Sequence, residues 1–261
     1  MVARLAVLLT LALVLAAAPA RGADASSATP AGARLVSCKR APTVDQRVAS
    51  VATWMRPISN GRHLAVKLDL WERRSGQRWA LRTDVPGLGV WVTPSDAGVG
   101  SRAGDVFKYR QAVGRLEVPA AYRFRVTFHW LDTDGNVVRE VSRTTAVCRQ
   151  PDLRPDLVLR DVTATATRTP GLVRYTVLVG NDGRSTVARA VIAATFPGET
   201  TPGSHTRTVR SLIAGATAVI RFTGPGCAAG GQPASFVADP SNLVEESDET
   251  NNGLAAVCPA P

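Results

Sequence analysis

Acidic and amide side chains are concentrated in residues 239–252, which read D-P-S-N-L-V-E-E-S-D-E-T-N-N. The carboxylates are Asp239, Glu245, Glu246, Asp248 and Glu249, and the amides are Asn242, Asn251 and Asn252. No Lys or Arg follows Arg221, so residues 222–261 have a formal charge of −5 in a chain whose net charge is +10. Oxygen ligands without a basic partner either bind a hard cation or accept hydrogen bonds from backbone N–H groups at a turn.

Two interpretations of this acidic stretch follow. In the first, calcium is bound by Asp239, Glu246, Glu249 and Asn252, an assignment that rests on ligand type and proximity because the spacing of an EF-hand is missing. In the second, the carboxylates and amides cap the turn between the last two strands and pair with arginines of a neighbouring strand. The sequence leaves both open, and apart from calcium we expect no cofactor.

The tryptophans form a second group of candidate functional residues. All five lie in the first half of the chain: Trp54, Trp71, Trp79, Trp91 and Trp130. Indole rings can stack on sugars, but they also fill sandwich cores, and we expect core positions for at least three of the five. Trp71 lies opposite the apolar row of residues 64–70 and is the first candidate for exposure. Trp71, Trp79 and Trp91 are therefore the candidate ligand-binding residues, and an exposed row of them would indicate a carbohydrate site.

Catalytic residues are not expected. The chain has three histidines, and it contains no Gly-x-Ser-x-Gly elbow, no His-Glu-x-x-His and no glycine-rich phosphate loop. His63 and His129 occupy strand positions opposite apolar residues, which indicates side chains facing solvent, and His205 follows a loop rich in Pro and Gly. A hydrolase is the third alternative, because a pair of carboxylates could converge from distant strands.

Alternation with period 2 defines the elements that hold these residues. Residues 122–130 alternate aromatic or β-branched side chains with polar ones, and residues 64–70 alternate leucine and valine with others. Further strands are predicted at 48–55, 78–82, 88–93, 106–112, 137–148, 156–167, 172–180, 186–196, 206–212, 217–223, 235–238 and 254–258. With no convincing amphipathic helix, the predicted fold is all-β: two antiparallel immunoglobulin-like β-sandwiches in tandem.

A proline-rich joint divides the chain. Pro151 and Pro155 cannot donate to a central ladder, which predicts a first domain at 34–150, a linker at 151–155 and a second domain at 156–261. The first domain holds 20 Lys or Arg against 10 Asp or Glu, and the second holds 9 against 10. The arginines are scattered, with Arg73-Arg74 the one adjacent pair. This distribution favours anionic wall polymers or acidic glycans as partners and argues against nucleic acid.

The N-terminus and the cysteines indicate export. Residues 1–20 read as a signal peptide, with an apolar run at 5–18 and an alternative cleavage after residue 25. No later segment approaches the roughly 20 apolar residues of a membrane span. Four cysteines allow three pairings, and their distribution in an exported chain favours Cys38 with Cys148 and Cys227 with Cys258. The oligomeric state is not indicated.

The acidic stretch resembles the closing pattern of the bacterial cell-adhesion-related domain CARDB, Asp-x-x-Asn-x-Val-x-Glu-x-x-Glu-x-Asn-Asn. The residues that fit are Asp239, Asn242, Val244, Glu246, Glu249, Asn251 and Asn252. Residues 156–158 and the Asn181-x-Gly183 turn also fit, so the resemblance covers residues 156–258. It implies a secreted or cell-surface, non-catalytic adhesion or binding module with an extracellular protein or glycan as partner. The alternative is a carbohydrate-binding or wall-polymer-binding protein that uses the basic, tryptophan-rich first domain.

Overall fold

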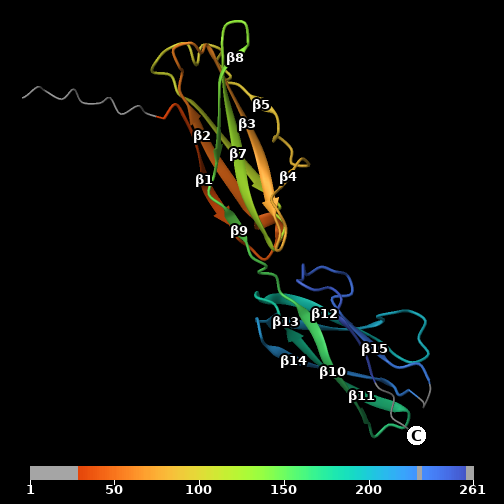
Figure 1. The fold of residues 1–261 in the computed structure, drawn as a ribbon. Helices are drawn as coiled ribbons and strands as arrows, with labels where there is room; N and C mark the ends of the chain where they lie inside the picture. Colours follow the sequence, from red (N-terminus) through yellow and green to blue (C-terminus); the bar gives the residue numbers. More distant parts are fainter. Residues whose placement is uncertain (1–28, 228–230, 257–261) are drawn as a thin grey trace, which may run out of the picture.

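The structure is a computed structural model that describes residues 29–227 and 231–256. The predicted signal peptide, with its end at residue 20 or 25, lies outside these residues, and so does Cys258. Within them every strand pair is antiparallel, and the single helical element is the short 3₁₀ helix η1 (Val44–Gln46). The predicted fold class, all-β with antiparallel sandwiches in tandem, is confirmed (Figure 1).

The first sandwich has two sheets that enclose one hydrophobic core. One sheet has the order β1-β2-β6, and the other has the order β4-β3-β7-β8, with β5 beside β3 and β9 beside β7. Its strands are β1 (Ala31–Lys39), β2 (Val48–Met55), β3 (His63–Arg73), β4 (Ala80–Arg82), β5 (Trp91–Val92), β6 (Phe107–Gly114), β7 (Ala120–Leu131), β8 (Val137–Thr144) and β9 (Cys148–Gln150).

β3 and β7 provide the centre of that core. They pair over eleven residues, from His63 opposite Leu131 to Arg73 opposite Ala121. Successive side chains of a strand point to opposite faces, so every second residue enters the core. The buried residues are Leu64, Val66, Leu68, Leu70, Tyr122, Phe124, Val126, Phe128 and Trp130. The predicted alternation along both strands is therefore present.

Two elements of the first sandwich differ from the sequence prediction. β1 is not among the predicted strands and begins at Ala31, before the predicted domain start at residue 34; its sequence alternates weakly, and its register shifts between Leu35 and Ser37. The predicted strand 137–148 is divided into β8 and β9. Between them Thr145 turns inward, where its Oγ1 accepts a hydrogen bond from the Phe124 N–H at 3.1 Å.

The second sandwich repeats the two-sheet architecture with the orders β10-β11-β14 and β13-β12-β15-β16. Its strands are β10 (Leu157–Ala166), β11 (Leu172–Asn181), β12 (Val187–Thr195), β13 (His205–Leu212), β14 (Thr217–Pro225), β15 (Ser235–Ala238) and β16 (Gly253–Ala255). Aromatic rings pack in its core, with the Tyr175 and Phe196 centroids 5.5 Å apart and the Phe222 and Phe236 centroids 5.6 Å apart. Each of the seven overlaps a predicted strand, although β16 ends at Ala255 and the prediction 254–258 extends beyond the described residues.

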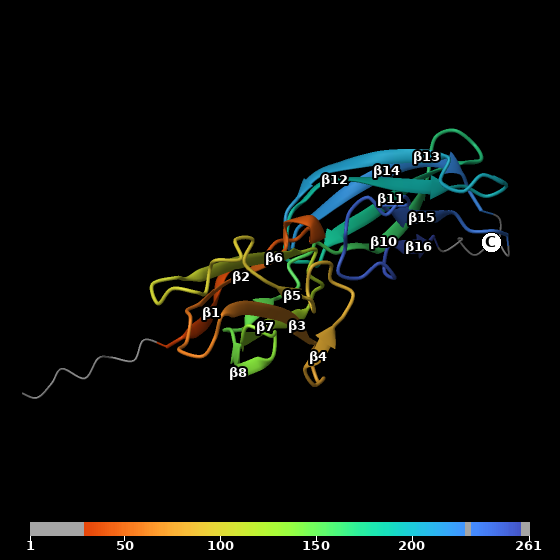
Figure 2. The same ribbon diagram turned by 90° about the horizontal axis from the view of Figure 1, so that it is seen from above.

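The two sandwiches lie end to end, and the chain passes between them from β9 to β10 (Figures 1 and 2). The connecting residues are bound to the second sandwich: the Arg154 carbonyl accepts from the Arg184 N–H at 2.9 Å, and the Leu153 carbonyl accepts from the Ser185 hydroxyl. Arg154 also pairs with Asp152 at 2.7 Å. The predicted linker therefore has a defined conformation, and independent folding of the two sandwiches stays a prediction.

One of the two predicted disulfides is present. Cys38 on β1 and Cys148 on β9 are bonded across a sequence separation of 110 residues, as expected for a protein of an oxidising compartment. The predicted partner of Cys227 is Cys258, which lies outside the described residues. None of the helices in the described ranges is both long and apolar enough to cross a membrane.

We predict that Cys227 is linked to Cys258. Because no Lys or Arg follows Arg221, trypsin leaves both cysteines in one peptide, 222–261. Mass spectrometry of the unreduced digest should find this peptide lighter by two hydrogen atoms than its reduced form. The joined peptides 35–39 and 144–149, which contain Cys38 and Cys148, serve as the internal control. A peptide from the first sandwich joined to 222–261 would contradict the pairing.

Candidate functional site

The outward side of the β3–β7 sheet brings together the three candidate tryptophans. Since the alternate residues of both strands fill the core, the intervening ones point away from it. These outward residues are Lys67, Asp69, Trp71 and Arg73 on β3, and Arg123, Arg125, Thr127 and His129 on β7. Trp79 and Trp91 contact several of them. We call the outward residues, together with Trp79 and Trp91, the tryptophan face.

Positive charges surround Trp71 and Trp79. Trp71 lies opposite Leu81 on β4 and opposite Arg123 on β7. The guanidinium carbons of Arg123 and Arg73 lie 4.2 Å and 4.9 Å from the centroid of the Trp79 ring. An aromatic ring attracts a guanidinium but leaves its charge in place, whereas a carboxylate neutralises it. Arg73 and Arg123 therefore lie against Trp79 on this face, and each keeps its full positive charge.

Trp91 is the most exposed of the three tryptophans on the face. Its side chain is 42% exposed, and its neighbour in register is Lys67, whose Nζ lies 5.2 Å from the ring centroid. The Trp91 and His129 ring centroids are 3.8 Å apart, and His129 Nε2 lies 2.7 Å from Glu140 Oε2. The indole thus extends across the sheet from β5 to β7, with aromatic surface open to solvent.

The structure corrects the expected distribution of the tryptophans. Only Trp130 is fully buried, where its Nε1 donates to the Arg56 carbonyl at 2.6 Å, although core positions are predicted for at least three of the five. Leucine, valine and phenylalanine fill the core in their place. Trp71 is half-buried between Leu81 and Arg123, and Trp91 is more exposed than Trp71, the first candidate. The role of the three residues in ligand binding stays a prediction.

Two of the three histidines, His129 and His205, form surface pairs with glutamates. Besides His129 with Glu140, His205 Nε2 lies 2.7 Å from Glu199 Oε1. The Ser204 hydroxyl also donates to Glu199, at 2.9 Å, so the carboxylate lies between the serine and the histidine. In a catalytic triad the histidine lies between the other two, because it must take the proton from the hydroxyl. This cluster therefore lacks the order that nucleophilic catalysis requires.

The acidic stretch forms the turn between β15 and β16, as predicted. Asp239 and Asn242 both have positive φ, 44° and 47°, and Asp239 Oδ2 accepts the Val244 N–H at 2.7 Å. Asp248 Oδ1 accepts the Thr250 N–H at 2.8 Å, and Glu249 Oε1 accepts the Glu246 N–H at 3.1 Å. We call residues 239–252 the acidic turn. Its carboxylates satisfy backbone donors that the turn leaves without strand partners.

Glu246 joins the acidic turn to the first strand of the second sandwich. Its side chain is 1% exposed, with one oxygen accepting the Leu157 N–H of β10 and the other accepting from Asn252 Nδ2 at 3.2 Å. Burial raises the pKa of Glu246 to about 7, and the charges of Glu249 and Asp239 act in the same direction, while the Leu157 and Asn252 donors oppose the shift. Near neutral pH this carboxyl group is therefore partly protonated.

The four residues predicted as calcium ligands are only partly brought together. Asn252 Nδ2 lies between Glu246 and Glu249, 3.2 Å and 3.4 Å from their oxygens, whereas Asp239 turns to the Val244 N–H. Across the described residues no group of three His, Cys, Asp or Glu side chains is arranged to hold a metal ion. The observed hydrogen bonds to backbone N–H groups fit the turn-capping interpretation, but in the described residues no carboxylate of this stretch pairs with an arginine of a neighbouring strand, and the calcium hypothesis stays a prediction.

Glu245, which sequence reasoning left out of the site, connects the two sandwiches. Its Oε2 accepts the Val44 N–H of η1 at 2.8 Å, and its Oε1 lies 2.8 Å from Arg47 Nη2. Arg47 is 1% exposed and also donates to three carbonyls of the first sandwich: Ala41, Pro42 and Leu116. Figure 2 shows the turn, in blue, extending from β15 toward the first sandwich. Only the tertiary structure reveals a pair separated by 198 residues.

Glu246 should make the second sandwich less stable as the pH rises from about 5 to 7. Its pKa is near 7 in the folded state and near 4.5 when exposed, so between these values the folded state holds the extra proton and the free energy of unfolding falls with pH. The loss is about 1.4 kcal/mol per pH unit at most. Glu246→Gln should remove this slope, measured by urea unfolding with the NMR signals of the buried Tyr175 ring. An unchanged slope in the variant would contradict the assignment.

Removing the Glu245 charge should destabilise the first sandwich. Glu245→Gln leaves the buried Arg47 guanidinium without its anion, at a cost of about 1 to 3 kcal/mol. Tryptophan fluorescence reports this loss selectively, because all five tryptophans lie in the first sandwich. Glu249→Gln is the matched control, with the same change of charge in the same turn, because the hydrogen bonds of Glu249 in the described residues are to Glu246 and Asn252 of that turn. Equal unfolding midpoints of both variants would contradict the coupling.

The chain resembles two fimbrial structures and one family model. Among solved structures, it is similar to a chaperone–tip adhesin complex of CFA/I fimbriae biogenesis (9% identity, 88% of this chain and 99% of that chain covered, TM-score 0.26). It is also similar to the class 5 fimbriae chaperone CfaA (8% identity, 88% and 100% covered, TM-score 0.25). Curated proteins give no match. The family model described as CARDB matches residues 154–256, which confirms the resemblance predicted from the acidic stretch.

Proposed function

We propose that this protein is a secreted or cell-surface, non-catalytic binding module whose ligand surface is the tryptophan face of the first sandwich. The CARDB match of the second sandwich supports an adhesion-related role outside the cytoplasm, and the Cys38–Cys148 disulfide fits an oxidising compartment. In this proposal the second sandwich supports the first sandwich, and the ligand contacts residues of the first sandwich alone.

Carbohydrate is the ligand class that the tryptophan face fits best. The observation that carries this proposal is the gathering of Trp71, Trp79 and Trp91 on one outward sheet surface, with Trp91 42% exposed. An open indole ring offers a flat apolar surface for a sugar ring. The neighbouring side chains of Asp69 and Arg125 provide donors and acceptors for hydroxyl groups.

Catalysis is not part of the proposal. Both histidine–glutamate pairs lie at the surface, and the Ser204, Glu199 and His205 cluster has the carboxylate in the middle. Among the described residues of the tryptophan face, the one hydroxyl side chain, Thr127, hydrogen-bonds to Ser142 and not to a base.

Replacing Trp91 should abolish most of the glycan affinity. The full chain is tested on an array of neutral and acidic oligosaccharides and on cell-wall fractions, followed by titration of the best ligand. Trp91→Ala removes the exposed aromatic surface and should weaken binding about tenfold or more, since tryptophans at the centre of an interface dominate its affinity.

Trp54→Ala is the matched control, because Trp54 is a half-buried tryptophan on the outer face of the other sheet. Its affinity should equal that of the unmodified protein. Equal affinities of the unmodified protein and Trp91→Ala, or loss in Trp54→Ala alone, would refute the tryptophan face as the binding surface.

A further inference from the structure

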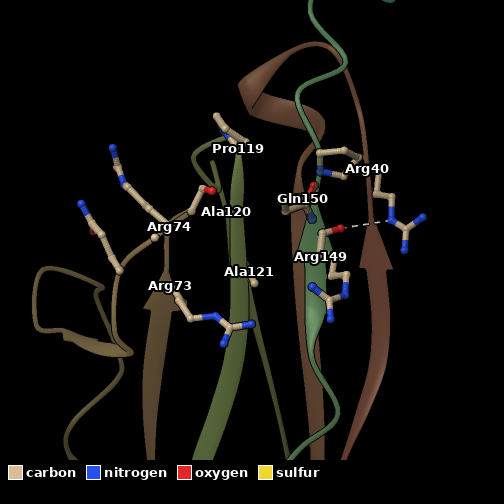
Figure 3. Close-up of a pocket in the computed structure, with 12 residues that line it drawn as sticks. Arg40, Arg73, Arg74, Pro119, Ala120, Ala121, Arg149 and Gln150 are labelled. Atoms are coloured by element: carbon tan, nitrogen blue, oxygen red, sulfur yellow. Dashed lines mark hydrogen bonds between the residues drawn. The ribbon is translucent and has the colours of Figure 1, made fainter.

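Four arginines line a cavity at the end of the first sandwich nearest the linker. The cavity has a volume of about 730 Å³, and Arg40, Arg73, Arg74 and Arg149 lie on its wall together with Gln150. Figure 3 shows Arg73 and Arg74 on one side of the start of β7, and Arg40 and Arg149 on the other. The lining contains no Asp or Glu. We call it the arginine cavity.

Strand register places two of these guanidinium groups over a small residue. Ala121 on β7 lies opposite Arg73 on β3 and opposite Arg149 on β9, so the three residues form one row across three strands. Neighbouring strands are about 4.8 Å apart, which puts the two arginine backbones roughly 10 Å apart. A methyl group between them leaves room for a ligand that both can reach.

The positive charges of the cavity are largely uncompensated. Arg74 pairs with Glu72 at 2.8 Å, but in the described residues Arg40, Arg73 and Arg149 form no ion pair. Arg73 instead contacts the Trp79 ring, and Arg40 Nε donates to the Arg149 carbonyl at 3.1 Å. A planar guanidinium binds carboxylate or phosphate through two parallel hydrogen bonds. Three such groups remain available for an external oxyanion.

Gln150 closes the cavity wall from the inward face of β9. Its side chain is 1% exposed, lies on the same strand face as the buried Cys148 and donates from Nε2 to the Lys39 carbonyl at 2.8 Å. The ligand groups of the cavity are therefore the arginines, whose side chains lie at its surface.

We propose that the arginine cavity binds the acidic groups of an anionic glycan. The inference rests on the function proposed above and extends it: Arg73 belongs to both the cavity and the tryptophan face, so one polymer chain can contact the arginines and Trp91. The anionic group is a carboxylate of a uronic acid or a phosphodiester of a wall polymer, which share the same bidentate recognition.

The test compares charged and uncharged forms of the same sugar. The full chain is titrated with oligogalacturonate, with its methyl ester, which has the same sugars without charge, and with a glycerol-phosphate oligomer. At least one of the two anionic oligomers should bind about tenfold or more tighter than the ester. Arg73→Gln with Arg149→Gln should weaken that binding about tenfold or more, and Arg149→Gln alone, which lies outside the tryptophan face, should leave binding of the ester unaffected. The Arg149 side chain forms no ion pair among the described residues, so Arg149→Gln alone should show part of the loss if the double variant does not fold.

The opposite sheet offers a matched control. Arg34 and Arg110 flank Ala52 in the same kind of row across β1, β2 and β6, beside a smaller cavity of about 360 Å³. Arg34→Gln with Arg110→Gln removes the same charge and should keep the affinity within about twofold. An equal loss in both double variants would overturn the site, because binding would then follow total charge.

The remaining outcomes separate the two proposals. Trp91-dependent binding that is equal for charged and esterified sugars would overturn the arginine cavity and leave the glycan-binding function standing. Absence of binding to every glycan would overturn both. A single-stranded oligonucleotide of equal charge serves as competitor, and displacement of the glycan at the same concentration would also overturn the proposal.

Discussion

The pairing of β3 with β7 is the constraint on which the first sandwich depends. Eleven consecutive residue pairs hold the two strands together, and their inward side chains form the centre of the core. Because side chains alternate, the same pairing determines what appears outside. A shift of register by one residue would bury Arg123 and Arg125 and expose Phe124 and Val126, so the core specifies the position of every residue on the tryptophan face.

A different constraint acts in the second sandwich, where a long turn must satisfy its own backbone donors. Asp239 holds the turn at its start, Glu249 accepts the Glu246 N–H, and Glu246 accepts the N–H of the first residue of β10. These contacts give a physical reason for the spacing of acidic and amide residues in the CARDB pattern. Glu245, the adjacent residue, lies outside that pattern and contacts the other sandwich. One short segment thus closes its own sandwich and connects it to the next.

Much of the fold follows from local sequence. Residues 64–70 and 122–130 alternate with period 2, which is a local signal for strands, and the cysteine distribution is a compositional signal for the disulfides. The same alternation predicts Trp71 on an outer face. Other features need the tertiary structure. Arg47 and Glu245 are far apart in the chain, and the arginine cavity joins residues of β3, β7 and β9 whose proximity depends on register. The expected burial of three tryptophans is wrong because indole size alone does not decide which strand face is inward.

Uncompensated charge and open aromatic surface occur together on one side of the first sandwich, and this coincidence is the centre of the functional account. Arg73, Arg123 and Lys67 lie against indole rings, where they keep their charge. The most direct test is hydroxyl-radical footprinting of the full chain with and without an acidic oligosaccharide. The account predicts reduced oxidation of Trp79 and Trp91 in the presence of the ligand, with Trp54 unchanged. Protection of Trp54, or protection confined to the second sandwich, would contradict it.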